Sequence, residues 1–104
     1  MINMDHELFQ QYSTQDHPVL VEFWAPWCVY CRRIAPALDK ISEQRTDLVV
    51  GQVNIDEVPL LAAKEQIEVI PTLILYKNGE ALGSVVAPES KSRIDEFIQE
   101  TIGM

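Results

Sequence analysis

Apolar residues in this chain gather in short runs that alternate with helical spacing. Val19–Trp24 is apolar apart from Glu22, and Leu48–Ile55 is a second such run, interrupted by two amides. Runs of this length predict buried strands of a parallel sheet. Between them, apolar residues recur at the i, i+4 and i+7 positions of a helix face: Ile34, Leu38 and Ile41. We therefore predict a βαβ unit with a right-handed crossover, whose helix is bent at Pro36.

Two further helices are predicted on either side of this unit. The first is capped by Asp5 or Asn3 and ends at Asp16–Pro18. Its apolar side consists of Leu8, Phe9 and Tyr12. The second follows the unit, with Asp56 as its cap and Pro59 in its first turn. Its apolar surface consists of Leu60, Leu61 and Ala62.

An antiparallel hairpin and a last helix complete the pattern. Thr72–Tyr76 and Ala81–Val86 flank Asn78-Gly79, a dipeptide that tolerates the positive φ angles of a tight turn. The last helix begins at about Ser90 or Ser92, with an acidic residue three positions after Ser92 as in a capping box. Its apolar face consists of Ile94, Phe97, Ile98 and Ile102. Because helices alternate with strands, we expect them to cover both faces of one sheet.

Length and composition are those of one folded domain spanning residues 1–104. Apolar residues make up 47% of the chain and charged residues 23%, which excludes a disordered or membrane-spanning chain. Eight Lys and Arg against 16 Asp and Glu give a formal charge of −8. This balance argues against nucleic acid or an anionic membrane as a partner, because phosphate binding is driven by cations. Met1–Glu7 has neither a basic start nor an apolar signal core, so we expect a cytoplasmic protein.

The candidate chemistry lies in the only two cysteines, Cys28 and Cys31, which closely follow the first apolar run. Positions i and i+3 of a helix share a face, with Cβ atoms roughly 5–6 Å apart, so that a small adjustment allows a disulfide. Unpaired N–H groups at a helix start favour the thiolate, which makes Cys28 the expected nucleophile. Cys31 lies one turn deeper and is the expected resolving thiol, which attacks the mixed disulfide.

A cysteine pair of this kind is also compatible with two roles that involve no redox chemistry. Free cysteines are often buried small hydrophobic residues, and Cys-x-x-Cys also forms half of zinc and iron–sulfur sites. The only histidines, His6 and His17, lack the spacing that would complete four ligands, so a metal would need a second chain. We expect neither a metal nor a cofactor.

Short motifs follow one another along nearly the whole chain: Val21–Cys31, Ala35-Pro36, Asn54–Asp56, Ile70–Thr72 and Lys77–Glu80. In this order and spacing they resemble the thioredoxin family. The resemblance implies a thioredoxin fold, an α/β architecture in which a central mixed β-sheet of four to five strands is flanked by about four helices. It also implies reversible dithiol–disulfide exchange with protein substrates, as in a protein-disulfide reductase.

Glu22 is the one charged residue of the first predicted strand. An ionised carboxylate is costly in a buried strand, so we expect the pKa of Glu22 to rise. The resemblance places a buried acid at this position and implies that it exchanges a proton with the resolving cysteine, although thioredoxins usually carry Asp there. The alternative is that Glu22 faces solvent or pairs with a lysine such as Lys40.

The resemblance also marks a substrate-facing surface. It implies that the Ile70–Pro71 bond is cis, that Pro71 faces the cysteines, and that the backbone of Ile70 pairs with an extended substrate segment. Trp27 would cover the core on its residue type alone, whereas in the family it is exposed beside the cysteines. Trp24 is expected in the core.

Some positions depart from the family pattern. Thioredoxins usually read Cys-Gly-Pro-Cys, whereas Val29-Tyr30 stands between the cysteines here. We expect this dipeptide to tune the redox couple toward a less strongly reducing potential, with the Tyr30 hydroxyl as one source of thiolate stabilisation. Gln52 stands where many thioredoxins have a lysine near the buried acid, and Ala87, followed by Pro88, stands where a glycine is usual.

Two function classes follow. The first is a thiol–disulfide oxidoreductase that exchanges a Cys28–Cys31 dithiol with protein disulfides, either as a reductant recharged by a thioredoxin reductase or as a more oxidising exchange catalyst. The second is a thioredoxin-fold binding module whose cysteine pair rarely cycles. The Trp27-Cys28 start, the acid and Ile70-Pro71-Thr72 favour the enzyme, and we expect it to be a monomer.

Overall fold

A mixed five-stranded sheet in the order β1-β3-β2-β4-β5 forms the centre of the protein. The computed structural model describes residues 1–103. The elements in chain order are β1 (Ile2–Asn3), α1 (His6–Ser13), β2 (Val19–Trp24), α2 (Val29–Gln44), β3 (Val49–Asn54), α3 (Pro59–Lys64), β4 (Thr72–Lys77), β5 (Glu80–Val86) and α4 (Lys91–Ile102). Strands β1, β3 and β2 are parallel, while β4 is antiparallel to both β2 and β5. The predicted α/β fold class is confirmed.

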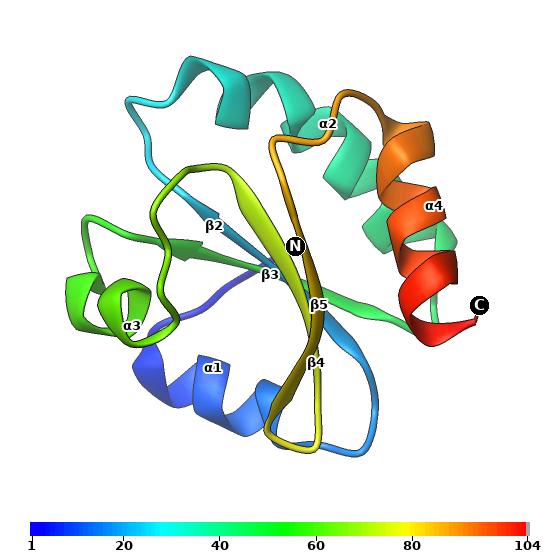
Figure 1. Ribbon diagram of the computed structural model, residues 1–104, viewed down its shortest axis with the longest axis horizontal. Helices are drawn as coiled ribbons and strands as arrows, with labels where there is room; N and C mark the ends of the chain where they lie inside the picture. Colours follow the sequence, from blue (N-terminus) through cyan, green and yellow to red (C-terminus); the bar gives the residue numbers. More distant parts are fainter. Residues whose placement is uncertain (104) are drawn as a thin grey trace.

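The two faces of the sheet are covered by different pairs of helices. In Figure 1, α2 and α4 lie on one side of the sheet and α1 and α3 on the other. Along β2, Leu20 packs with the cluster that includes α2 and α4, whereas Val19, Val21 and Phe23 pack with α1 and α3. Alternate residues of a strand point to opposite faces, and both faces are covered by helices, which explains why β2 is apolar apart from Glu22. Glu22 therefore lies on the α2 face.

The predicted helix starts are only partly confirmed. Asp5 caps α1, where its Oδ1 accepts a hydrogen bond from the Leu8 N–H at 2.9 Å. The prediction for α3 is wrong: its N-cap is Val58, with no side-chain cap, and Asp56 is engaged elsewhere. The side chain of Leu60 is 84% exposed, because it lies on the outer side of this short helix.

The last helix and the hairpin settle two further predictions. Ser90 caps α4, so Ser92 is not the cap and does not begin a capping box. Asn78 and Gly79 have φ angles of 55° and 80°, as the tight turn between β4 and β5 requires. Pro36 lies inside α2, as predicted.

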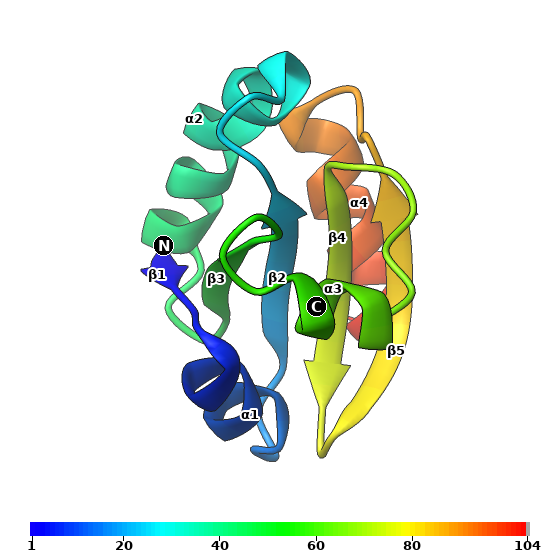
Figure 2. The same cartoon turned by 90° about the vertical axis from the view of Figure 1, so that its left-hand side faces the viewer.

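Four segments meet at one end of the sheet. In both Figure 1 and Figure 2, the end of β2, the first turns of α2, the start of β4 and the loop after β5 lie at the upper end, with α1 at the opposite end. The cysteines lie at this end, where β2 passes into α2. Within residues 1–103, no helix is both long and apolar enough to cross a membrane.

Candidate functional site

Cys28 and Cys31 are joined by a disulfide in the first turn of α2, with Cα atoms 5.3 Å apart. Cys28 is the N-cap of the helix, and its Sγ accepts a hydrogen bond from the Cys31 N–H at 3.2 Å. The first N–H groups of a helix have no partner inside it, so a sulfur at the N-cap lies where negative charge is stabilised. The predicted position of Cys28 at the helix start is confirmed.

The two sulfur-bearing residues differ in exposure. Cys28 is 8% exposed and Cys31 is 2% exposed, and both pack with Ala25 in a small cluster that Trp24, Tyr30 and Ile70 border. Cys28 is thus the more accessible of two well-shielded cysteines. The order of burial agrees with the expectation that Cys31 is the deeper residue.

Glu22 lies on β2 and is only 2% exposed. Its Oε2 atom is buried and has no hydrogen-bond partner among residues 1–103. Burial raises the pKa of the Glu22 carboxyl from 4.5 to about 8, and the charge of Asp39 adds to the rise. The alternative that Glu22 faces solvent is wrong, and the expected rise in its pKa is confirmed.

A pocket of about 300 Å³ connects Glu22 with Cys31. Its wall includes Trp24, Asp39 and Gln52. The Trp24 Nε1 is a second buried polar atom without a partner in the described part of the chain. Buried polar groups are normally paired, so a pocket lined by two residues with unpaired atoms is suited to hold water. The carboxyl and the deeper cysteine share this space.

Of these neighbours, sequence analysis singled out Gln52 but not Asp39. Gln52, which replaces a lysine of the family pattern, donates a hydrogen bond from its side-chain amide to Asn3 Oδ1. Asp39 lies on the exposed side of α2, and sequence analysis gave it no role. It lies eight positions after Cys31 on the same helix. This spacing of slightly more than two turns was the signal in the sequence that could have placed Asp39 on the same side of the helix as Cys31.

The predicted substrate-facing residues are Trp27, Ile70 and Pro71, and of these Ile70 borders the cysteine cluster. The Ile70–Pro71 bond is cis, as the resemblance implied, and Ile70 packs against the cysteine cluster. Trp27 is 65% exposed, so the alternative in which it covers the core is wrong. Its Nε1 donates a hydrogen bond to Asp56 Oδ2 at 3.0 Å, which orients the indole ring. The carboxylate of Asp56 thus accepts a hydrogen bond from Trp27 and does not cap α3.

The residues between the cysteines face in different directions. Val29 is exposed, whereas Tyr30 is half-buried and packs against both the cysteine cluster and the larger core. The Tyr30 hydroxyl donates a hydrogen bond to the Pro88 carbonyl oxygen at 2.7 Å. Its proton therefore does not point to the sulfurs, so the expected stabilisation of the thiolate by this hydroxyl is not what the geometry provides.

The arrangement suits two-electron exchange between thiols and a disulfide. It contains a sulfur at a helix N-cap that is the less shielded of the two, a second sulfur bonded to the first, and a buried acid that shares a pocket with the second. No group of three or more His, Cys, Asp or Glu side chains that could hold a metal ion occurs within residues 1–103.

Comparison with known proteins gives a consistent result. The thioredoxin family profile matches residues 1–100. A thioredoxin of Porphyra purpurea is 37% identical over 99 residues, covering 94% of this chain and 92% of the relative. A thioredoxin 1 of Nostoc sp. is 38% identical over 97 residues, covering 92% of this chain and 91% of the relative.

Two further similarities concern fold and partner. A thioredoxin structure from Plasmodium falciparum superimposes with a TM-score of 0.88 at 31% identity, covering 96% of this chain and 98% of the other. A bifunctional thioredoxin reductase/thioredoxin of Mycobacterium leprae is 37% identical over 99 residues, which cover 94% of this chain and 22% of that protein.

Proposed function

Because this chain belongs to the thioredoxin family, we propose that Cys28 and Cys31 act in sequence, as attacking and resolving thiols, in the reduction of protein disulfides. The chain is a thiol–disulfide oxidoreductase, since it has the family's fold and a cysteine pair that forms a disulfide. The observation that carries the proposal is the N-cap position of Cys28, whose sulfur accepts the Cys31 N–H while the Cys31 side chain lies deeper.

The reaction begins with the reduced pair. The Cys28 thiolate attacks one sulfur of a substrate disulfide, which forms a mixed disulfide and releases the other substrate sulfur as a thiolate that takes up a proton. Cys31 then loses its proton and attacks the Cys28 Sγ, and the second substrate sulfur leaves as a thiolate that takes up a proton. Two electrons have passed to the substrate, and Cys28 and Cys31 are joined in the disulfide that the structure contains.

Glu22 in its ionised form is proposed to take the proton that Cys31 loses. A carboxyl whose pKa is about 8 exchanges protons near neutral pH, which is what general acid–base catalysis requires. The pocket that Glu22 shares with Cys31 supports transfer through water. Glu22 acts on the deeper cysteine because the two residues line the same space.

Recognition is proposed to involve the surface around the disulfide. The exposed ring of Trp27 and the backbone of Ile70, next to Pro71, flank the sulfurs and fit an extended polypeptide segment. Val29 adds a further exposed apolar side chain beside Cys28.

The oxidised pair must be reduced again between turnovers. We propose that a thioredoxin reductase supplies these electrons, and the fused reductase and thioredoxin of Mycobacterium leprae supports this choice of partner. The proposed place of action is the cytoplasm, where thiols are kept reduced.

Insulin reduction tests the proposed function. With dithiothreitol as electron source, the protein should accelerate the reduction of insulin disulfides at least tenfold, and Cys28→Ser should abolish the acceleration. Ser13→Ala, far from the cysteines on α1, is a control that should retain it. A rate no higher than that of dithiothreitol alone would instead indicate a binding module.

A further inference from the structure

The loop of residues 87–89, between β5 and α4, has an unusual backbone for its sequence. Ala87 has a φ angle of 45°, in the left-handed region that favours glycine. A residue other than glycine stays in this region only when its surroundings hold it there. The contacts of this loop therefore indicate what maintains its shape.

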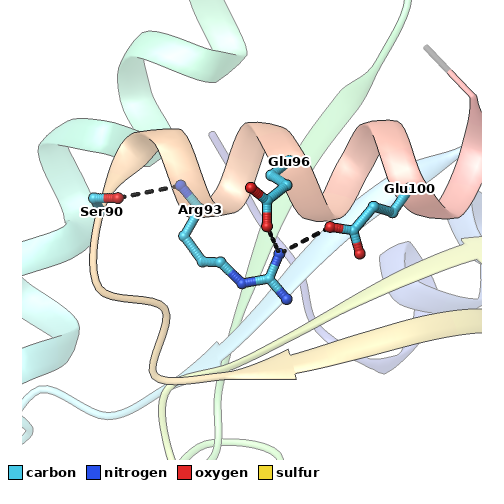
Figure 3. Close-up of polar contacts among 4 residues, drawn as sticks. All are labelled: Ser90, Arg93, Glu96 and Glu100. Carbon is cyan, nitrogen blue, oxygen red and sulfur yellow. Dashed lines mark hydrogen bonds and ion pairs between the residues drawn. The ribbon is translucent and has the colours of Figure 1, made fainter.

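Three hydrogen bonds hold the loop and its end. The Ala87 N–H donates to the Pro71 carbonyl at 2.8 Å, and the Tyr30 hydroxyl donates to the Pro88 carbonyl at 2.7 Å. At the far end, Ser90 Oγ accepts the Arg93 N–H at 3.1 Å, as Figure 3 shows. The first two bonds connect the loop to the start of β4 and to the first turn of α2.

Of these three bonds, only the one from the Tyr30 hydroxyl depends on the residue type between the two cysteines. Tyr30 and Pro88 are 58 positions apart in the chain, yet the loop runs beside the first turns of α2 in both Figure 1 and Figure 2. A tyrosine at position 30 reaches the loop, whereas a proline, usual there in the family, has no donor to offer.

We propose that Tyr30 is a positioning residue that holds the loop of residues 87–89 in place as one wall of the substrate site, and so favours protein disulfides over small ones. Two of the departures from the family pattern, Tyr30 and Ala87, are thereby explained together. The hydrogen bond of Tyr30 compensates for the loss of glycine at position 87.

The position of the loop connects this bond to the reaction. The Ala87 N–H of the loop is bonded to the carbonyl of Pro71, the residue that follows Ile70. Ile70 and Tyr30 both border the cysteine cluster. A polypeptide lying along Ile70 meets this wall, but a small disulfide that reaches Cys28 alone does not. The inference therefore rests on the proposed reduction of protein disulfides.

Tyr30→Phe removes the hydroxyl and keeps the ring. The first measurement is hydrogen exchange of the Ala87 amide by NMR, which does not depend on any activity. We expect exchange at least fivefold faster in Tyr30→Phe and unchanged in Tyr12→Phe, a half-buried tyrosine on α1 at the opposite end of the sheet. Unchanged exchange in Tyr30→Phe would overturn the proposal even if insulin is reduced normally.

The second measurement compares single-turnover rate constants of the reduced protein with insulin and with bis(hydroxyethyl) disulfide. The ratio of the two constants should fall at least threefold in Tyr30→Phe. It should recover to within twofold of the Ala87→Gly value in the double variant Tyr30→Phe/Ala87→Gly, because glycine adopts this φ angle unaided.

Additive effects of the two substitutions, or an equal loss toward both disulfides, would contradict the proposed positioning. If Tyr30→Phe fails to fold, the ratio of the two rate constants is compared between the double variant and Ala87→Gly, which also differ only at position 30. An equal ratio in these two variants supports the proposal, and a threefold difference contradicts it. A further outcome is that the unmodified protein reduces neither disulfide while the Ala87 amide still exchanges faster in Tyr30→Phe. That result would contradict the proposed function but would leave the role of the hydrogen bond in the loop intact.

Discussion

The buried carboxyl group of Glu22 lines the pocket beside Cys31. Its pKa is about 8 in the folded protein and near 4.5 when the chain is unfolded. Between these values the folded state keeps a proton that the unfolded state has lost, so stability falls as pH rises through this window. Below it both states are protonated, and above it both are ionised.

Glu22→Gln is expected to remove this pH dependence and the proton transfer together. The free energy of unfolding of the unmodified protein should fall relative to that of the variant by about 1.4 kcal/mol per pH unit between about pH 5 and about pH 8. The pH profile of insulin reduction should also change between about pH 6 and about pH 9. Denaturant unfolding and initial rates across these ranges measure both effects.

Glu43→Gln, an exposed acid on the same helix as Asp39, provides the control and should leave both profiles unaltered. Parallel stability curves for Glu22→Gln and the unmodified protein would show that the carboxyl is not held neutral. An unchanged rate profile would remove Glu22 from the proton transfer.

We expect the dipeptide between the cysteines to tune the redox couple through its backbone. Tyr30 lies at the second position of α2, where an N–H has no partner inside the helix, and proline would remove that donor. Val29→Gly/Tyr30→Pro should therefore be more reducing, by roughly 30 mV or more, the equivalent of one hydrogen bond to a thiolate. A redox titration against glutathione measures the shift. Equal potentials, or a more oxidising variant, would show that this donor does not stabilise the thiolate.

At the scale of elements, helix starts show where sequence prediction reaches its limit. Ser90 and Ser92 both precede the apolar face of α4, and only the fold shows that Ser90 accepts the Arg93 N–H (Figure 3). Asp56 has the residue type of a helix cap, but Trp27, 29 positions away, uses its carboxylate. Local patterns cannot reveal such a distant partner, because each candidate donor is equally compatible with the same short sequence.

Ser90→Ala should lower the free energy of unfolding by about 1 kcal/mol, since it leaves the Arg93 N–H without its partner. Ser92→Ala, an exposed position inside the same helix, should change it by less than about 0.5 kcal/mol. Urea denaturation of both variants measures the difference. Equal losses would mean that the cap contributes nothing beyond ordinary helix propensity.

At the scale of the whole molecule, the fold was predictable because its signals are repeated in many residues. Residues 19–23 of the first apolar run are buried, and so are Ile34, Leu38 and Ile41, which were predicted to form one helix face. The cysteine pair was equally clear, since both sulfurs lie within one helical turn.

The surroundings of the site were less predictable. The Tyr30–Pro88 hydrogen bond and the pocket shared by Glu22 and Asp39 depend on how β2, α2 and the loop after β5 pack together. No short sequence pattern encodes such packing. Single residues from distant segments meet there, each with several possible partners.

The separate roles of the two cysteines form the central claim, and trapping the mixed disulfide tests it most directly. Cys31→Ser, mixed in its reduced form with insulin, should accumulate a covalent adduct on Cys28 that dithiothreitol releases, because no resolving thiol is present. Cys28→Ser should form at most one tenth as much adduct, since its remaining cysteine is the deeper one. Peptide mapping by mass spectrometry identifies the linked residue. Equal adduct yields, or more adduct on Cys31, would contradict the assignment of Cys28 as the attacking thiol.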